Sequence, residues 1–341
     1  MKISFTIILI FIVRLGLAQD PEFSQYYAAP LYLNPAFTGT TNDHRFISNY
    51  RNQWPSVAQG YRTYALSYDY NLTGLNSGFG FMAMQDQAGS AGMRSTEFNF
   101  LYSYKLPIAN KWIISSGLNF GYASRSIDFN KLIFGDQLVL GSNSTIPTSD
   151  PILSNAGMTQ YFDFKAGMLA YNRNVWIGFA ANHINEPNRS LLHQYAYVPL
   201  KISVHGGVRI PLYGGLLKRD RIPVLSPSFV YKRQANFEQL DVGAYLLYEP
   251  IIFGLWYRGI PVIKNADRNP MQDAAVVILG FQFSQFEVVY SYDFTVSRLG
   301  PASGGAHELA LKYLIEIPER KKTKKRDGWI PCPSFIRKER N

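Results

Sequence analysis

Five histidines and one cysteine are the side chains of this sequence best suited to metal binding or nucleophilic catalysis, but their spacing supports neither. These residues are His44, His183, His193, His205, His307 and Cys332. No two histidines have the spacing of a zinc motif, and HExxH, CxxC, G-x-S-x-G and glycine-rich phosphate-loop sequences are absent. A Ser–His dyad would need a serine beside His205 on the next strand, and a histidine hydrogen-bonded inside the fold is the simpler interpretation. We expect no catalytic residue, no metal and no cofactor.

Charged side chains form a more informative set, because they fall on the polar side of alternating segments. They are Asp69, Asp163, Lys165, Arg209, Asp241, Arg258, Asp293, Glu308 and Lys312. One interpretation is a layer of paired, hydrogen-bonded charges that fills the interior, since an unpaired buried charge is costly. The other is a selectivity lining for a solute channel. The mixture of signs favours the paired layer.

The elements that must position these charges are strands. In "EFNFLYSYK", Phe98, Phe100 and Tyr104 alternate with polar residues at period two, as in a strand with one apolar face. Fourteen such segments can be placed, and no segment of ten or more residues has the pattern of an amphipathic helix. The predicted strands cover 44–52, 61–71, 78–86, 94–105, 111–123, 160–172, 174–182, 200–210, 223–232, 237–247, 250–258, 272–283, 286–294 and 306–316.

The connections between these strands alternate in length. Those after even-numbered strands are mostly tight and those after odd-numbered strands are mostly long, with "PLYGGLLKRDRI" and "QANF" as exceptions. Alternating loop lengths, aromatic faces and an even strand number are typical of an outer-membrane barrel, in which every backbone polar group is paired. A soluble β-sandwich would show the same alternation, but the aromatic share of 15% and the charged share of only 17% favour the membrane.

The two ends of the chain differ from its middle. Residues 1–18 have the charge, apolar run and small-residue end of a secretory signal peptide, and the run is too short to span a membrane. The net charge of +10 lies mostly in the basic tail 317–341 and in the signal, so the folded part is nearly neutral and nucleic-acid binding is not expected. A single cysteine excludes an internal disulfide framework.

The segment "DPEFSQYYAAPLYLNPAFTG" carries a family resemblance. It resembles the N-terminal signature of the PorP/SprF outer-membrane proteins of Bacteroidetes, although Ala28–Ala29 stand where that family commonly has a small polar residue or Asn. Further similar motifs follow in order along the chain: "YRNQWP" at 50–55, "SYDY" at 67–70, "WYRG" at 256–259, "SYDFTVSRLG" at 291–300, "SGGAHELALKY" at 303–313 and "CPSF" at 332–335.

The resemblance implies a non-enzymatic component of the type IX secretion and gliding machinery. Its implied partners are the periplasmic ring lipoproteins, or a large secreted surface adhesin with a C-terminal sorting domain, together with outer-membrane lipid. A channel for small or hydrophobic solutes is the alternative. The residues expected to form a plug or to bind partners are Pro21, Phe23, Ser24, Gln25, Tyr26, Asn34, Pro35, Arg51, Trp54, Arg258, Asp293, His307, Glu308, Cys332 and Pro333.

The expected organisation follows from these observations. A signal peptide (1–18) precedes an N-terminal periplasmic or plug segment (19–43), a β-barrel (44–316) and a basic periplasmic tail (317–341). Because the strand number is even, we expect both termini on the periplasmic side of the outer membrane.

Overall fold

A computed structural model describes residues 20–41, 43–57, 60–89, 92–108, 111–128, 132, 135–137, 157–192, 194–213, 222–260, 273–297 and 300–315. The predictions for the signal peptide, for His193 and for the tail with Cys332 and Pro333 lie outside these residues.

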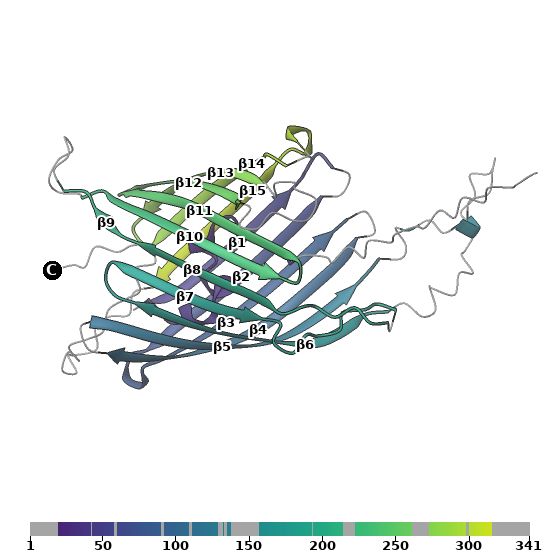
Figure 1. Ribbon diagram of the computed structural model, residues 1–341, viewed down its shortest axis with the longest axis horizontal. Coiled ribbons are helices and arrows are strands. Elements are labelled where there is room, and N and C mark those ends of the chain that lie inside the picture. The colour runs from purple at the N-terminus through teal and green to yellow at the C-terminus, as the bar shows by residue number, and fades with distance from the viewer. Residues whose placement is uncertain are drawn as a thin grey trace, which may run out of the picture.

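The described chain is a closed antiparallel β-barrel (Figure 1). Apart from β8 and β9, which both pair with β10, each strand pairs with its neighbours in the sequence. β15 pairs with β1 and β11 pairs with both β10 and β12, so the sheet has no open edge. The strands are β1 (His44–Gln53), β2 (Tyr61–Leu72), β3 (Ser77–Ala88), β4 (Met93–Ile108), β5 (Trp112–Ser126), β6 (Thr159–Tyr171), β7 (Val175–Asn182), β8 (Lys201–Val208), β9 (Ile210–Pro211), β10 (Val224–Gln234), β11 (Phe237–Tyr248), β12 (Ile251–Ile260), β13 (Ala274–Phe283), β14 (Phe286–Thr295) and β15 (Ala306–Ile315).

The short β9 continues β8 after a break at Arg209, and both pair with β10. The wall of the barrel therefore consists of fourteen strands, counting β8 and β9 as one, as the sequence predicts, and the strand ends differ from the predicted ones by at most three residues. Irregular backbone can lie in a membrane barrel only where the protein or an aqueous lumen satisfies it, which is why regular strands make up the wall.

In the described residues, helical structure is limited to short turns. These are η1 (Tyr26–Ala28), α1 (Pro30–Leu33), η2 (Pro35–Phe37), η3 (Thr73–Leu75), η6 (Gly135–Gln137) and η7 (Pro301–Ser303). No helix in the described part of the chain is both long and apolar enough to cross a membrane.

The wall has an apolar outer face, whereas its inner face combines polar and charged side chains with apolar ones that pack against residues 26–37. On β4, Phe98, Phe100 and Tyr104 are exposed on the outside, whereas Asn99 and Ser103 are buried on the inside. The alternation of outward and inward side chains repeats around the barrel, because successive side chains of a strand point to opposite faces. On β11–β13 many of the inward side chains are apolar, among them Tyr245, Trp256 and Ile278. It confirms the period-two pattern seen in the sequence.

The two ends of the barrel differ in their connections. We call the end with residues 127–158, 183–200, 261–273 and 296–305 the long-loop end, which lies on the right in Figure 1. We call the other end, with the turns 73–76, 109–111, 172–174, 249–250 and 284–285, the short-turn end. The connection 212–223 is the long exception at the short-turn end, and 235–236 is the tight exception at the long-loop end. β1 begins and β15 ends at the short-turn end.

Candidate functional site

Residues 20–41, which we call the plug, run through the inside of the barrel from one end to the other. Asp20 contacts His183 and Lys201, which lie where β7 ends and β8 begins, at the long-loop end. Gly39 donates its backbone N–H to Asp69 Oδ2 (2.6 Å), and Asp69 lies near the short-turn end of β2. The plug therefore enters the lumen at the long-loop end and leaves it at the short-turn end, where β1 begins. The expectation that both termini lie at the short-turn end does not hold for Asp20, the first described residue.

The first plug residue is held by a buried histidine. His183 Nε2 lies 2.8 Å from Asp20 Oδ2 and its Nδ1 lies 2.9 Å from Asp163 Oδ1, while Lys201 Nζ lies 3.3 Å from the same oxygen of Asp20. Burial alone would lower the pKa of His183, but the carboxylate of Asp20 and the hydrogen bonds to both acids raise it to about 9. Burial would raise the pKa of Asp20, whereas Lys201 and His183 hold it well below its usual value. We call the group of Asp20, Asp163, His183 and Lys201 the Asp20 latch.

The next plug residues join a buried network of charges, the Ser24 cluster. Its members are Ser24, Arg51, Arg258, Asp293 and Glu308, each less than 5% exposed. Ser24 Oγ donates to Asp293 (2.7 Å) and accepts from Arg51 Nη1 (2.8 Å) and Arg258 Nη1 (2.7 Å). Asp293 also pairs with both guanidinium groups, at 2.8 and 3.0 Å.

Glu308 completes this cluster by binding the plug backbone. Its two carboxylate oxygens accept from the N–H groups of Ser24 (2.7 Å) and Gln25 (3.1 Å), and Arg51 pairs with the same carboxylate at 3.1 Å. The Gln25 amide donates to Ser291 Oγ (3.1 Å) and the Glu308 backbone oxygen (3.0 Å). Two arginines thus face Asp293 and Glu308 together with the plug, while Arg258 Nε also pairs with Asp273 (2.6 Å) and Arg51 also donates to Gln53 (3.3 Å). A buried ionic network is stable only under such conditions.

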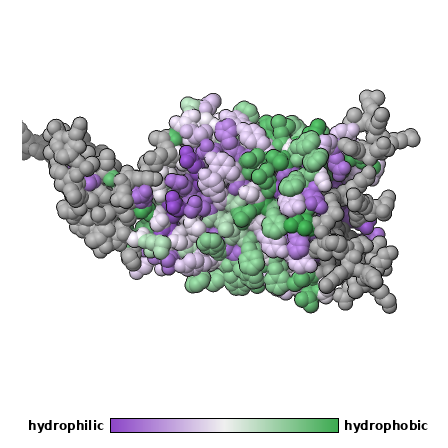
Figure 2. Space-filling model, turned by 180° about the vertical axis from the view of Figure 1, so that it is seen from behind, coloured by the Kyte–Doolittle hydropathy of each residue, from purple (hydrophilic) through white to green (hydrophobic). Residues whose placement is uncertain are grey.

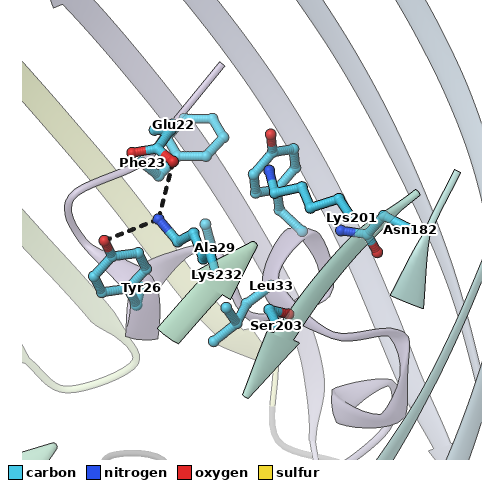
Figure 3. Close-up of a pocket in the computed structure, with 10 residues that line it drawn as sticks. Glu22, Phe23, Tyr26, Ala29, Leu33, Asn182, Lys201, Ser203 and Lys232 are labelled. Atoms are coloured by element: carbon cyan, nitrogen blue, oxygen red, sulfur yellow. Dashed lines mark hydrogen bonds and ion pairs between the residues drawn. The ribbon is translucent and has the colours of Figure 1, made fainter. Parts of the chain in front are cut away.

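Beside this cluster, Glu22 and Tyr26 hold a second lysine (Figure 3). Lys232 Nζ lies 3.1 Å from Glu22 Oε1 and 3.2 Å from the Tyr26 hydroxyl, which itself hydrogen-bonds to Asp241. Burial would raise the pKa of Glu22, but Lys232 and Arg258 lower it to about 2. Next to these residues lies a cavity of about 20 Å³ that Phe23 and Leu33 also line. The cavity has room for about one water molecule.

The middle of the plug is fixed by Asn34, which is fully buried. Its Nδ2 donates to the backbone oxygens of Met168 and Phe179 (both 3.1 Å) and lies 3.0 Å from His205 Nε2. Its Oδ1 accepts from Ala36 N (2.8 Å) and caps η2, which Pro35 begins. The partner found for His205 Nε2 is therefore the plug amide and not a serine.

Eleven of the fifteen residues proposed from the sequence lie in the plug or touch it. Pro21, Phe23, Ser24, Gln25, Tyr26, Asn34 and Pro35 are plug residues, and Arg51, Arg258, Asp293 and Glu308 bind it from the wall. Trp54 instead directly follows β1, in the connection to β2. There its backbone N–H donates to the backbone oxygen of Gly305 (2.7 Å). His307 faces outwards and lies 2.7 Å from the Tyr290 hydroxyl. Cys332 and Pro333 lie outside the described residues.

Sequence reasoning missed Glu22 in the plug and four charged wall residues that bind the plug: Arg45, His183, Lys201 and Lys232. Lys201 lies four residues before His205 on β8, and Lys232 lies two residues after Val230 on β10. Side chains an even number of positions apart point to the same face of a strand, so this spacing could have placed both lysines in the lumen. Among the described residues, no three His, Cys, Asp or Glu side chains are arranged to hold a metal ion. The arrangement is suited to holding a peptide segment in place.

Known proteins provide three kinds of comparison. No curated protein matches the sequence. Similar solved structures include the Acinetobacter baumannii outer membrane protein Omp33 (7% identity, TM-score 0.45, 82% of this chain and 100% of that chain). They also include the Ralstonia pickettii toluene transporter TbuX (10% identity, TM-score 0.46, 85% of this chain and 94% of that chain). The family model described as type IX secretion system membrane protein PorP/SprF matches residues 16–313. Barrel, motifs and family match agree, and the chain belongs to the PorP/SprF family of type IX secretion system membrane proteins.

Proposed function

We propose that this protein is a plugged docking barrel of the outer membrane, which acts without catalysis by holding other components of the type IX machinery or its cargo. The partner is the periplasmic ring or a large secreted adhesin with a C-terminal sorting domain. The observation that carries this proposal is the plug, which is bound to strands on all sides of the lumen by buried hydrogen bonds and ion pairs. A solute channel would have to displace it.

The proposed orientation follows from the connections of the barrel. Outer-membrane barrels have short periplasmic turns and longer extracellular loops. In this orientation β15 ends in the periplasm, where the chain beyond it is available to the ring. The plug begins at the cell surface with Asp20 and descends through the lumen to His44. The long loops, with the exposed Tyr195 and Tyr197 on connection 183–200, are then available to a secreted protein.

Planar-bilayer recording tests docking against transport. We expect no steady conductance from the purified full-length protein and discrete open events after deletion of residues 20–39. Deletion should also impair function or assembly in cells. A steady open pore in the intact protein would support the channel alternative and contradict the docking proposal.

Deletion of the gene separates the two docking roles. Loss of one surface adhesin, with other secreted cargo unaffected, is expected of a barrel dedicated to that cargo. Loss of all type IX cargo is expected of a core component that binds the ring. Unchanged secretion and an unchanged cell surface would contradict both roles.

A further inference from the structure

Two arginines lie on the outer wall near the long-loop end, one strand apart. Arg62 on β2 is opposite Gln87 on β3, and Gln87 is opposite Arg94 on β4. All three side chains lie on the outer face, since their neighbours Thr63 and Asp86 hydrogen-bond to each other on the inside. Adjacent strands are about 4.8 Å apart, so the two arginines start about 10 Å from each other.

Within the described residues, neither guanidinium group has a hydrogen bond or an ion pair. The acids of β1–β5 are Asp69, Asp86 and Glu97, and each is used inside the barrel, by Arg45, Thr63 and Lys165 respectively. Arg62 and Arg94 are both exposed. By contrast, the exposed Arg233 near the long-loop end of β10 pairs with Glu238 at 3.4 Å. The wall of β2–β4 therefore carries two unneutralised positive charges.

The rows of side chains next to these arginines change from polar to apolar toward the middle of the barrel. The next outward row holds Tyr64, Gln85 and Thr96, and Gln85 Nε2 donates to Thr96 Oγ1 (3.3 Å). After it come Leu66 and Phe98, which are 59% and 60% exposed, and then Phe81 and Phe100. Figure 2 shows the same division on one face, where hydrophilic residues gather toward the long-loop end and hydrophobic residues cover much of the middle.

We propose that Arg62 and Arg94 bind the phosphate groups of lipid A in the outer leaflet, with Gln87 between them as a hydrogen-bond donor. Guanidinium groups form short, strong hydrogen bonds with phosphate. The acyl chains of the lipid lie against Leu66, Phe98 and Phe81. This site rests on the proposed orientation, which makes the long-loop end the outer one, but it does not depend on the docking role.

The test measures lipid binding to the purified full-length protein in detergent by the rise of its unfolding temperature. The probes are bis-phosphorylated lipid A, the same lipid A without phosphates, and phosphatidylglycerol. The variants are Arg62→Ala with Arg94→Ala, and Arg233→Ala as a matched control from the same end of the barrel. Neither Arg62 nor Arg94 has a partner within the part of the chain that the structure describes, so we expect the double variant to fold.

We expect bis-phosphorylated lipid A to stabilise the wild type and Arg233→Ala alike. Each arginine near an anionic surface contributes about a fivefold change in affinity, so the double variant should bind about 30-fold more weakly. Equal stabilisation of the double variant, or equal stabilisation by dephosphorylated lipid A, overturns the site. Equal stabilisation by phosphatidylglycerol contradicts the assignment to lipid A. Orientation is tested separately by cysteine labelling, so a failure of the lipid site is distinguishable from a failure of the orientation.

Discussion

Asp20 and His44 lie at opposite ends of the barrel, although they are close in sequence. Asp20 is held by His183 at the long-loop end, and His44 begins β1 at the short-turn end. The plug between them is covalently joined to the wall only through β1, and its first residues are held by ion pairs, hydrogen bonds and the apolar packing of Phe23. Any withdrawal of the plug must therefore proceed toward the short-turn end, after the Asp20 latch and the Ser24 cluster have opened.

This arrangement predicts the labelling pattern of single cysteines. Cys332 is the only native cysteine, so Cys332→Ser provides a clean background. Pro21→Cys should react with a membrane-impermeant maleimide under the same conditions as Asn236→Cys, which lies in the turn 235–236 at the long-loop end. Gly74→Cys lies in the turn 73–76 and should show the opposite accessibility, because a Cβ there meets no other atom and the turn is at the short-turn end.

The comparison is made on intact and on permeabilised cells, with folding checked by heat-modifiable migration. Should Pro21→Cys react in neither sample, an epitope inserted directly before Asp20 replaces it as the probe. If Pro21→Cys or the epitope has the same accessibility as Gly74→Cys in both samples, the plug does not pass through the barrel.

The wall was predictable because period-two alternation is a local signal. Phe98 and Phe100 point outwards whatever their neighbours in space are, so the strands and their number follow from the sequence. The same parity rule could have corrected one candidate. Glu308 faces the lumen, so the adjacent His307 must face outwards, as the structure has it.

The path of the plug was not predictable, because its contacts are non-local. Ser24 meets Asp293 and Arg258, which are far away in sequence, and no periodicity in Pro21–Gly39 indicates them. Closely spaced prolines exclude a strand and a long helix, but they do not indicate at which end the segment enters. That choice depends on pairs such as Asp20 with Lys201, which form only once the barrel has closed.

The Ser24 cluster should contribute more to stability than an ion pair at the rim. Asp293→Ala removes the shared partner of two buried arginines, and breaking a buried pair in this way costs about 3–5 kcal/mol. Glu238→Ala breaks the pair with Arg233, which is 61% exposed, and should cost about 0–1 kcal/mol. Urea unfolding in phospholipid vesicles, followed by tryptophan fluorescence, measures both. Equal losses would indicate that the cluster does not hold the plug.

Glycines in the wall should prove necessary where the plug passes closest. A Cβ on Gly117 would lie 2.3 Å from the backbone of Pro35 and Ala36, and neither strand nor plug backbone can give way easily. Gly117→Ala should therefore destabilise the fold by about 1–3 kcal/mol and increase hydrogen exchange across residues 34–39. Gly74→Ala meets no atom within 4 Å and is the matched control. Unchanged exchange in Gly117→Ala would contradict the packing of η2 against β5.

The Asp20 latch should weaken as the pH rises. His183 has a folded pKa of about 9, above its ordinary value of 6.5, so its stabilising contribution is complete below pH 6.5 and is lost as the pH rises through 9. A shift of this size corresponds to about 3 kcal/mol. The loss of the imidazolium charge leaves Asp20 and Asp163 facing a neutral ring, with Lys201 and Lys165 as the nearest cations.

Hydrogen exchange of residues 20–26, corrected for the intrinsic effect of pH, should therefore rise between pH 7 and 9.5. His183→Gln should exchange faster at pH 7 and lose most of this dependence, whereas His307→Gln on the outer face should behave as the wild type. The same pH dependence in His183→Gln would assign the titration to another group and remove His183 from the latch.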